Sequence, residues 1–249
     1  MTQPLVLSLF PGIGLLDMAF EEEGFCVVRG PDLLWGGDNR RFHPPSGKFA
    51  GVIGGPPCQK FSRMRHINPK CGEKHGNMIP EFERVVDEAQ PDWFLMENVQ
   101  EAPIPALIGY TVRPYLIRDV WVGGETTRLR RFSFGCSWRM PDARLDIEVL
   151  ALHRTDPKPA VLAGGSGRAV PIALGGSGKI KSSRRVCAGD RKTRDGFAAA
   201  LEGQGLPADF DLPPFTVAAK VHAVGNGVPL PMGRAVARAV KRAMYERAA

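Results

Sequence analysis

The N-terminal stretch constrains the fold most, because its hydrophobic pattern changes from that of a strand to that of a helix across a glycine turn. Leu5–Phe10 is a short apolar run of the strand type, and Pro11-Gly12-Ile13-Gly14 separates it from a helix expected over Leu15–Glu23. A strand, a glycine turn and a helix open many nucleotide-binding βαβ units. Further strands are expected at 26–29, 51–53 and 93–97, with a helix from about 78 to 89 before the last. This alternation predicts an α/β fold with a mostly parallel sheet.

Length, cysteine content and hydropathy limit the class of protein. The 249 residues, 43% of them hydrophobic, can bury one full core and a small second lobe. The five cysteines have no paired Cys-x-x-Cys spacing, so we expect no disulfide framework and no metal, and a reducing compartment. The N-terminal apolar run is too short for a signal peptide, and no later run reaches membrane-spanning length. A cytoplasmic protein without a membrane partner is therefore expected.

The second half of the chain changes in character. Strands are expected at 113–122 and 131–134, paired as a hairpin around Gly123-Gly124. From about 139 to 214 the chain is rich in Gly, Pro and basic residues, which we interpret as a small second lobe. A helix is expected over 229–247. The predicted domains are thus a catalytic and cofactor-binding domain at 1–138, a lobe at 139–214 and a returning C-terminal segment at 215–249.

One cysteine follows a strand at a place where the backbone is restricted. Pro56-Pro57 fixes the chain ahead of Cys58, and Gly54-Gly55 leaves room for a ligand to lie close. Open parallel sheets carry their chemistry on the loops after the carboxyl ends of the strands. Cys58 is therefore a candidate nucleophile, with a buried structural cysteine as the alternative.

Three further side chains have the chemistry to act on a ring. Glu97 follows an apolar strand and is expected at the same sheet edge as Cys58, where it either binds a ring nitrogen or caps a helix. Arg128 and Arg130 place two guanidinium groups beside a strand. Such a pair can anchor a base carbonyl and a backbone carbonyl or phosphate.

A cofactor site is expected at the first glycine turn. Phe10-x-Gly12-x-Gly14 lets a ligand approach the backbone near a helix N-terminus. Asp32 lies about twenty residues further on, where an acid grips a ribose hydroxyl group. Asp38 is a second acid that can accept a hydrogen bond from an adenine amino group. Each of the two is also compatible with an ordinary loop aspartate.

The formal net charge of +7 is unevenly distributed. Residues 60–74 carry five basic residues against one acid, and residues 179–194 carry seven against one. Either run alone is compatible with a solvated face. Two runs, one of them directly after the candidate nucleophile, favour a nucleic-acid substrate, because its phosphates need neutralising groups near the chemistry.

In this order, the elements resemble the DNA cytosine-C5 methyltransferase family. The matching motifs are Phe10-Pro11-Gly12-Ile13-Gly14, Gly55-Pro56-Pro57-Cys58-Gln59-Lys60-Phe61-Ser62, Glu97-Asn98-Val99, Arg128-Leu129-Arg130, Gln204-Gly205-Leu206-Pro207 and Gly225-Asn226-Gly227-Val228-Pro229. They cover nearly the whole chain outside the second lobe, and the cysteine motif is the most specific of them.

The resemblance implies a class I S-adenosylmethionine-dependent methyltransferase fold, Rossmann-like with a mostly parallel sheet, and a small target-recognition lobe. It implies S-adenosyl-L-methionine as cofactor and double-stranded DNA as partner. We expect a monomer in the cytoplasm of a bacterial or phage-infected cell, where it belongs to a restriction-modification system or a phage. The implied cofactor-binding residues are Phe10, Gly12, Gly14, Asp32, Asp38, Pro57, Asn226 and Val228. The implied DNA-binding residues are Gln59, Lys60, Ser62, Arg63, Arg65, Arg168, Lys179, Arg184 and Arg185.

The implied mechanism follows from the weak nucleophilicity of cytosine C5. The Cys58 thiolate adds to C6 and makes C5 enamine-like, Glu97 holds the proton on N3, and Arg130 binds the O2 carbonyl with Arg128 supporting it. C5 then takes the methyl group of S-adenosylmethionine, and loss of the C5 proton expels the thiol. Because C5 and C6 are inaccessible in a stacked duplex, the base must be flipped out.

The sequence departs from the family pattern in three places. Thr126 stands where a glutamine is expected before the arginine pair. Only five residues separate Asp32 from Asp38, too few for a crossover helix, so either the adenine side of the pocket is less covered or Asp32 is not the ribose ligand. The second lobe is also short for a target-recognition domain.

Two other functions remain open at this point. One is methylation of cytosine in transfer RNA by the same chemistry, and the other is a DNA-binding pseudoenzyme. The presence of Cys58, Glu97 and both arginines argues against the pseudoenzyme.

Overall fold

A computed structural model describes residues 3–57, 61, 76–150 and 194–246. The chain divides into two compact units. Unit 1 takes in residues 1–117, 129–148 and 233–249, and unit 2 takes in residues 118–128 and 149–232. The predicted lobe at 139–214 and C-terminal segment at 215–249 stay predictions, but the compact units have different bounds: residues 118–128 group with 149–232.

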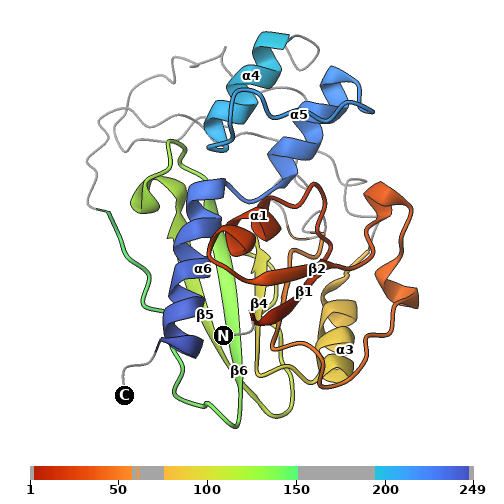
Figure 1. Ribbon diagram of the computed structural model, residues 1–249, viewed down its shortest axis with the longest axis vertical. Coiled ribbons are helices and arrows are strands. Elements are labelled where there is room, and N and C mark those ends of the chain that lie inside the picture. Colours follow the sequence, from red (N-terminus) through yellow and green to blue (C-terminus); the bar gives the residue numbers. More distant parts are fainter. Residues whose placement is uncertain (1–2, 58–60, 62–75, 151–193, 247–249) are drawn as a thin grey trace. The chain divides into compact units, whose positions relative to one another are not determined.

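A six-stranded sheet forms the centre of unit 1 (Figure 1). Its strands are β1 (Leu5–Leu9), β2 (Cys26–Arg29), β3 (Gly51–Gly54), β4 (Trp93–Asn98), β5 (Tyr110–Arg118) and β6 (Leu129–Ser137), in the order β2-β1-β3-β4-β6-β5. The first four strands are parallel, and β6 runs antiparallel to β4. The carboxyl ends of β1, β3 and β4 therefore share one edge, as expected for a Rossmann-like sheet.

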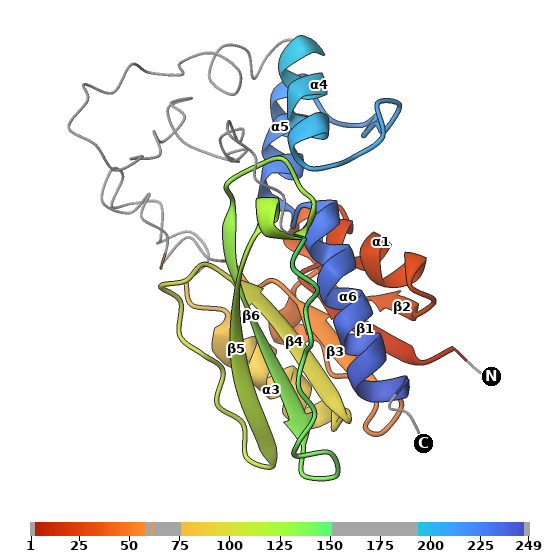
Figure 2. The same cartoon turned by 90° about the vertical axis from the view of Figure 1, so that its left-hand side faces the viewer.

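Helices cover both faces of this sheet. Helix α1 (Leu15–Glu22) and the unit 1 part of α6 (Leu230–Tyr245) lie on one face, and α3 (Ile79–Ala89) lies on the other (Figure 2). Beneath α3, Phe82 packs edge-on against Phe94 of β4, with ring centroids 5.9 Å apart. Under α1 and α6, the Trp93 indole stacks on Phe20 and donates a hydrogen bond of 2.9 Å to the Tyr245 hydroxyl group. Burial of these aromatic side chains is the main source of stability for such a layer.

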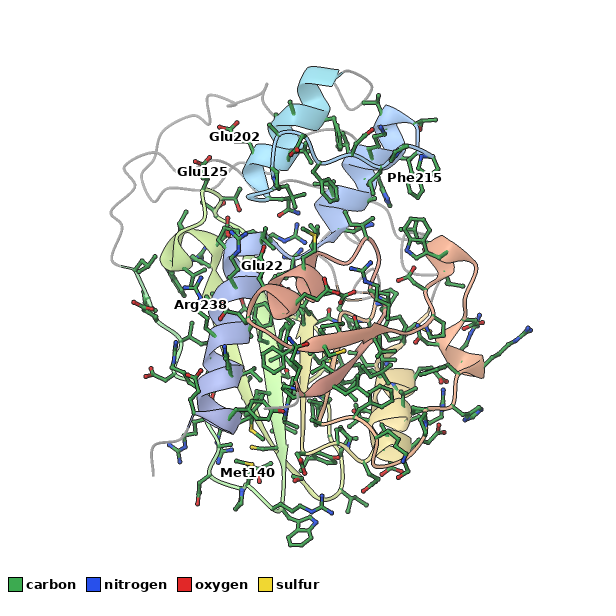
Figure 3. The ribbon with its side chains drawn as sticks, in the orientation of Figure 1. Glu22, Glu125, Met140, Glu202, Phe215 and Arg238 are labelled. Carbon is green, nitrogen blue, oxygen red and sulfur yellow. The ribbon has the colours of Figure 1, made fainter. Side chains whose placement is uncertain are left out.

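Helices α1 and α6 pack closely at Gly233, and ion pairs also join them. A Cβ atom on Gly233 would lie 2.9 Å from that of Ala19, so a side chain at 233 would push the helices apart. Glu22 lies at the end of α1 and pairs with Arg234 of α6, and Arg238 one turn later pairs with Glu23 (Figure 3). Together these contacts hold α6 against α1 and the residue that follows it.

The described residues of unit 2 form a turn, two helices and their connections. They are η4 (Asp119–Val122), a 3-10 turn, with α4 (Arg194–Gly203) and α5 (Val217–Asn226). Gln204, directly after α4, donates to the Val224 carbonyl oxygen at 2.6 Å and accepts a main-chain bond from Leu230. The Asp119 carboxylate accepts from both the backbone and the hydroxyl group of Thr126, and burial raises its pKa.

Most of the predicted elements are confirmed within one or two residues. The main error is at 113–122, where β5 ends at Arg118 and a 3-10 turn follows. Gly123 ends this turn in the left-handed region at φ 90°. The hydrophobic pattern also gave no signal for α4 and α5. Between β2 and β3 the chain forms only two 3-10 turns, η1 (Leu33–Trp35) and η2 (Asn39–Arg41), in agreement with the missing crossover helix.

Candidate active site

The turn between β1 and α1 has the backbone that its glycines predict. Phe10, Gly12 and Gly14 have positive φ angles of 54°, 57° and 81°. A Cβ atom on Gly12 would meet nothing within 4 Å, so this part of the turn is open to a ligand. At Gly14, by contrast, the φ angle of 81° would strain any other residue, and a Cβ atom would lie 2.9 Å from the Arg29 guanidinium and displace it.

The buried carboxylate of Asp17 forms hydrogen bonds next to the same turn. Asp17 on α1 accepts a 2.5 Å hydrogen bond from the Ser8 hydroxyl group and a 3.0 Å bond from Nε of Arg29. Burial raises the pKa of Asp17, and the bonds from Ser8 and Arg29 act against that shift. The network joins β1, α1 and β2, because each of these elements contributes one of its side chains. It therefore sets the position of the Arg29 guanidinium next to Gly14.

The side chains of Asp32 and Trp35 both form hydrogen bonds with the backbone of Gly12, one with its amide and the other with its carbonyl oxygen. The Asp32 carboxylate accepts from the Gly12 amide at 2.9 Å and from the Leu34 amide at 2.7 Å. The Trp35 indole donates to the Gly12 carbonyl oxygen at 2.6 Å, while the residue as a whole is 56% exposed. Trp35 was missed by the sequence reasoning, although an aromatic residue three positions after the predicted ribose ligand is a usable signal.

Asp38 has a different environment. Its carboxylate caps η2 by accepting from the Arg40 amide and forms an ion pair of 2.7 Å with the Arg40 guanidinium. These bonds hold its pKa below the ordinary value. Of the two predicted cofactor carboxylates, only Asp32 therefore touches the glycine turn.

Glu97 lies beside the segment that leads to the candidate nucleophile. In the parallel register of β3 and β4, Gly54 pairs with Met96, which brings Glu97 next to Gly55. A Cβ atom on Gly55 would come within 3.1 Å of Oε2 of Glu97. The Oε1 atom of Glu97 forms an ion pair of 2.8 Å with Nε of Arg130 from the neighbouring strand β6.

The residue after Glu97 fixes the same segment by a hydrogen bond. The buried Asn98 side chain donates to the Pro56 carbonyl oxygen at 3.1 Å and accepts from the Val99 amide at 2.9 Å. Pro57 follows at the end of the described segment. The polypeptide ahead of Cys58 is thus attached to the end of β4.

Arg128 has another set of partners, in unit 2. Its guanidinium is buried and donates to the carbonyl oxygens of Gly225 at 2.8 Å and Asn226 at 3.5 Å, at the end of α5. The Asn226 side chain is exposed and Val228 is buried. The arginine pair therefore serves two different places, with Arg130 bound to Glu97, and the catalytic role of Arg128 stays a prediction.

Many of the predicted site residues lie outside the described residues. They are Cys58, Gln59, Lys60, Ser62, Arg63, Arg65, Arg168, Lys179, Arg184 and Arg185. In the part of the chain that is described, no three His, Cys, Asp or Glu side chains come together as a metal site. The helices described here include none with the length and hydropathy to cross a membrane.

Comparison with known proteins agrees with this geometry. Residues 38–103, which include the Cys58 and Glu97 motifs, match the model of the C-5 cytosine-specific DNA methylase family. This segment of the chain is therefore similar to the cytosine-C5 methylase family. It is 32% identical over 114 residues to the Type II methyltransferase M.FnuDI of Fusobacterium nucleatum, and 30% identical over 112 residues to M.NgoPII of Neisseria gonorrhoeae. Each match covers 38% of this chain and about a third of the relative, 32% and 33% respectively.

A solved structure is similar in fold to this chain over almost its whole length. A protein encoded within an E. coli prophage, described as a DNA modification methyltransferase, superimposes with a TM-score of 0.64. The superposition covers 97% of this chain and 99% of the other, at 18% sequence identity. The predicted class I methyltransferase fold is thereby confirmed.

Proposed function

We propose that this chain transfers a methyl group to C5 of a cytosine in duplex DNA. The observation that carries the proposal is the position of Glu97, which lies against Gly55, three residues before Cys58, and is held by Arg130. A carboxyl group and a thiol are the two groups needed to activate a pyrimidine ring, and in the sequence Cys58 follows the segment that Glu97 contacts. The Type II methyltransferases among the relatives support DNA as the substrate.

The glycine turn fits the cofactor that this reaction needs. Gly12 is open on the side where a Cβ atom would project, Asp32 is held against the turn, and the exposed Trp35 indole offers a flat apolar face beside it. An adenosyl group has a flat ring and ribose hydroxyl groups for such partners. We assign this turn to S-adenosylmethionine, which supplies an electrophilic methyl group when bound. Phe10, Gly14, Asp38, Pro57, Asn226 and Val228 remain the other proposed cofactor residues.

The chain's own groups activate the cytosine. The Cys58 thiolate forms a bond to C6, and the electron pair of the C5–C6 double bond moves toward C5. Glu97, as the carboxylic acid, holds the proton at N3, and Arg130 places positive charge at O2. After C5 has been methylated, loss of its proton restores the double bond and expels the thiolate. The ion pair between Glu97 and Arg130 keeps the two side chains close together, as is needed for them to bind the neighbouring N3 and O2 atoms of the cytosine.

Access to C5 and C6 requires that the cytosine leave the base stack. Gln59, Lys60, Ser62, Arg63 and Arg65 follow the nucleophile directly and are proposed to contact the DNA backbone. Basic residues in the second run are proposed to read the target. The Type II methyltransferases among the relatives support a bacterial restriction-modification setting, and a prophage origin fits the solved structure named above. We propose a monomer acting in the cytoplasm.

The test is methyl transfer from labelled cofactor to duplex DNA and, in parallel, to transfer RNA. We expect labelled DNA, unlabelled RNA, and no label on either with Cys58→Ala. DNA containing 5-fluorocytosine at the target should form a denaturant-stable adduct with the native protein, because fluorine cannot leave C5 as a proton does. Label on the transfer RNA and none on the DNA would mean that RNA, and not DNA, is the substrate. DNA binding without transfer or adduct would indicate a pseudoenzyme.

A further inference from the structure

Two neighbouring arginines on β6 serve opposite faces of the end of β4. In the antiparallel register, Phe132 lies opposite Glu97 and Arg131 lies opposite Asn98. Successive side chains of a strand point to opposite faces. Arg130 therefore shares a face with Glu97, to which it is paired, and Arg131 shares the other face with Asn98.

Arg131 binds the polypeptide that follows Glu97. Its Nη1 atom donates to the carbonyl oxygen of Gln100 at 2.8 Å. Its Nη2 atom donates to the carbonyl oxygens of Ala102 and Pro103, the latter at 2.9 Å. One guanidinium group thus connects three carbonyl oxygens within four consecutive residues through a rigid planar fork of donors, which the rotating ammonium group of lysine lacks.

Burial of the Arg131 guanidinium lowers the free energy of unfolding of the protein. Arg131 is only 7% exposed, and desolvation lowers its pKa, with the nearby Glu101 acting against that shift. Among the described residues its Nε atom has no hydrogen-bond partner. A buried cation with an unsatisfied donor is often less stable than an apolar side chain of similar volume. A gain in positioning explains its presence better than a gain in stability.

We propose that Arg131 is a positioning residue that sets the place of Glu97. By holding residues 100–103, it fixes the chain where it leaves β4, and so fixes Glu97 and Asn98 immediately before it. Asn98 in turn holds the Pro56 carbonyl oxygen ahead of Cys58. Arg131 thereby holds together the segments that carry the carboxyl group and the thiol. This inference rests on the proposed function for its effect on catalysis, but its structural part does not.

The experiment compares Arg131→Met and Arg131→Lys with Arg113→Met in the full-length protein. Arg113 is a matched control, because it also binds main-chain carbonyl oxygens, those of Ala143 and Pro141, but at a distance from Glu97 in the sequence and the sheet. Four quantities are measured: the melting temperature, kcat and KM for DNA methylation, and hydrogen exchange of the amides at 99–102. Lysine keeps the charge but loses the three-point geometry, which separates positioning from electrostatics.

We expect Arg131→Met to reduce kcat by about 10-fold to 100-fold, since small displacements of a catalytic group have effects of that size. Its KM should change by less than about threefold, and the amides at 99–102 should exchange faster. Arg131→Lys should share both changes in part, and Arg113→Met should lower only the melting temperature.

Equal losses of kcat in Arg131→Met and Arg113→Met at equal melting temperature would overturn the proposal. So would unchanged exchange at 99–102, whether the protein methylates DNA or not. If the native protein shows no methyl transfer, the proposed function fails, and the exchange data alone decide whether Arg131 holds this segment. If Arg131→Met does not fold, the same two readouts on Arg131→Lys decide.

Discussion

The Nε atom of Arg130 lies 2.8 Å from Oε1 of Glu97, and the two side chains are only 19% and 12% exposed. The same Glu97 carboxyl group is the one proposed to bind the ring nitrogen N3, so removal of either partner changes the surroundings of the other. The consequence is that the two residues act as one unit.

Glu97→Gln should reduce kcat by about 100-fold or more, because a positioned acid contributes an effect of that size. Affinity for DNA should change little. Arg130→Lys should also reduce kcat, and the double variant should lose much less than the product of the two single losses, since both remove the same unit. Steady-state kinetics on the four proteins measure this. Parallel losses of affinity and turnover in Glu97→Gln would indicate a structural role.

Asp32→Ala should weaken cofactor binding by about tenfold, because loss of a charge-assisted hydrogen bond of the Gly12 type costs about 1.5–3 kcal/mol. Asp38→Ala should weaken it less, since its carboxylate serves a surface pair with Arg40. Calorimetry with S-adenosylmethionine on both variants gives the ranking. A larger effect of Asp38→Ala would make Asp38 the principal cofactor carboxylate and leave Asp32 a local cap.

Arg128→Met should destabilise unit 2, because the guanidinium binds the Gly225 and Asn226 carbonyl oxygens at the end of α5. The expected loss is about 2–3 kcal/mol in the free energy of unfolding. Chemical denaturation of the native and variant proteins measures it, with hydrogen exchange in α5 as a local readout. Full stability combined with a large loss of kcat would restore Arg128 to the catalytic role that the sequence motif implies.

The Glu22–Arg234 pair should make part of the stability depend on pH. The bond from Arg234 lowers the pKa of Glu22 below its ordinary value of 4.5. A lowered carboxyl pKa adds stability above the unfolded value, and this is lost as the pH falls through the folded value. The gain should be less than about 1 kcal/mol, since the pair is partly exposed.

Denaturation of Glu22→Gln at pH 7 and at pH 3 tests this dependence, with Glu246→Gln as control because its pair with Lys241 is 3.9 Å long. Glu22→Gln should be less stable than the native protein at pH 7 and about equal to it at pH 3. A difference that persists at pH 3 would point to packing rather than charge.

The two basic runs should differ in what they do to DNA. Neutralising Lys60, Arg63 or Arg65 should weaken binding to all sequences and reduce its salt dependence. At least one change among Arg168, Lys179, Arg184 and Arg185 should alter the preferred target, because base contacts carry sequence information and phosphate contacts do not. Methylome sequencing of cells expressing each variant is the measurement. If every lobe variant keeps the parental target and loses only rate, the reader lies elsewhere.

Local sequence determined the parallel sheet, the glycine turn and the place of Glu97. The reason is that hydrophobic period and backbone restriction act over a few neighbouring residues, and the carboxyl ends of parallel strands necessarily share an edge. Leu5–Leu9, Gly12 and Trp93–Asn98 all follow from such short-range rules. The same rules failed at 119–122, where the chain forms a 3-10 turn that ends at Gly123 with positive φ.

Only the tertiary structure decided which partner each polar side chain has. Arg128 and Arg130 are two residues apart and look equivalent in the sequence, yet one binds the end of α5 and the other binds Glu97. Arg131 belongs to none of the matching motifs, and its three carbonyl acceptors lie 28 to 31 residues earlier in the chain. Hydrogen-bond partners depend on the register of strands that are distant in sequence, and that register is set by the packing of the whole sheet.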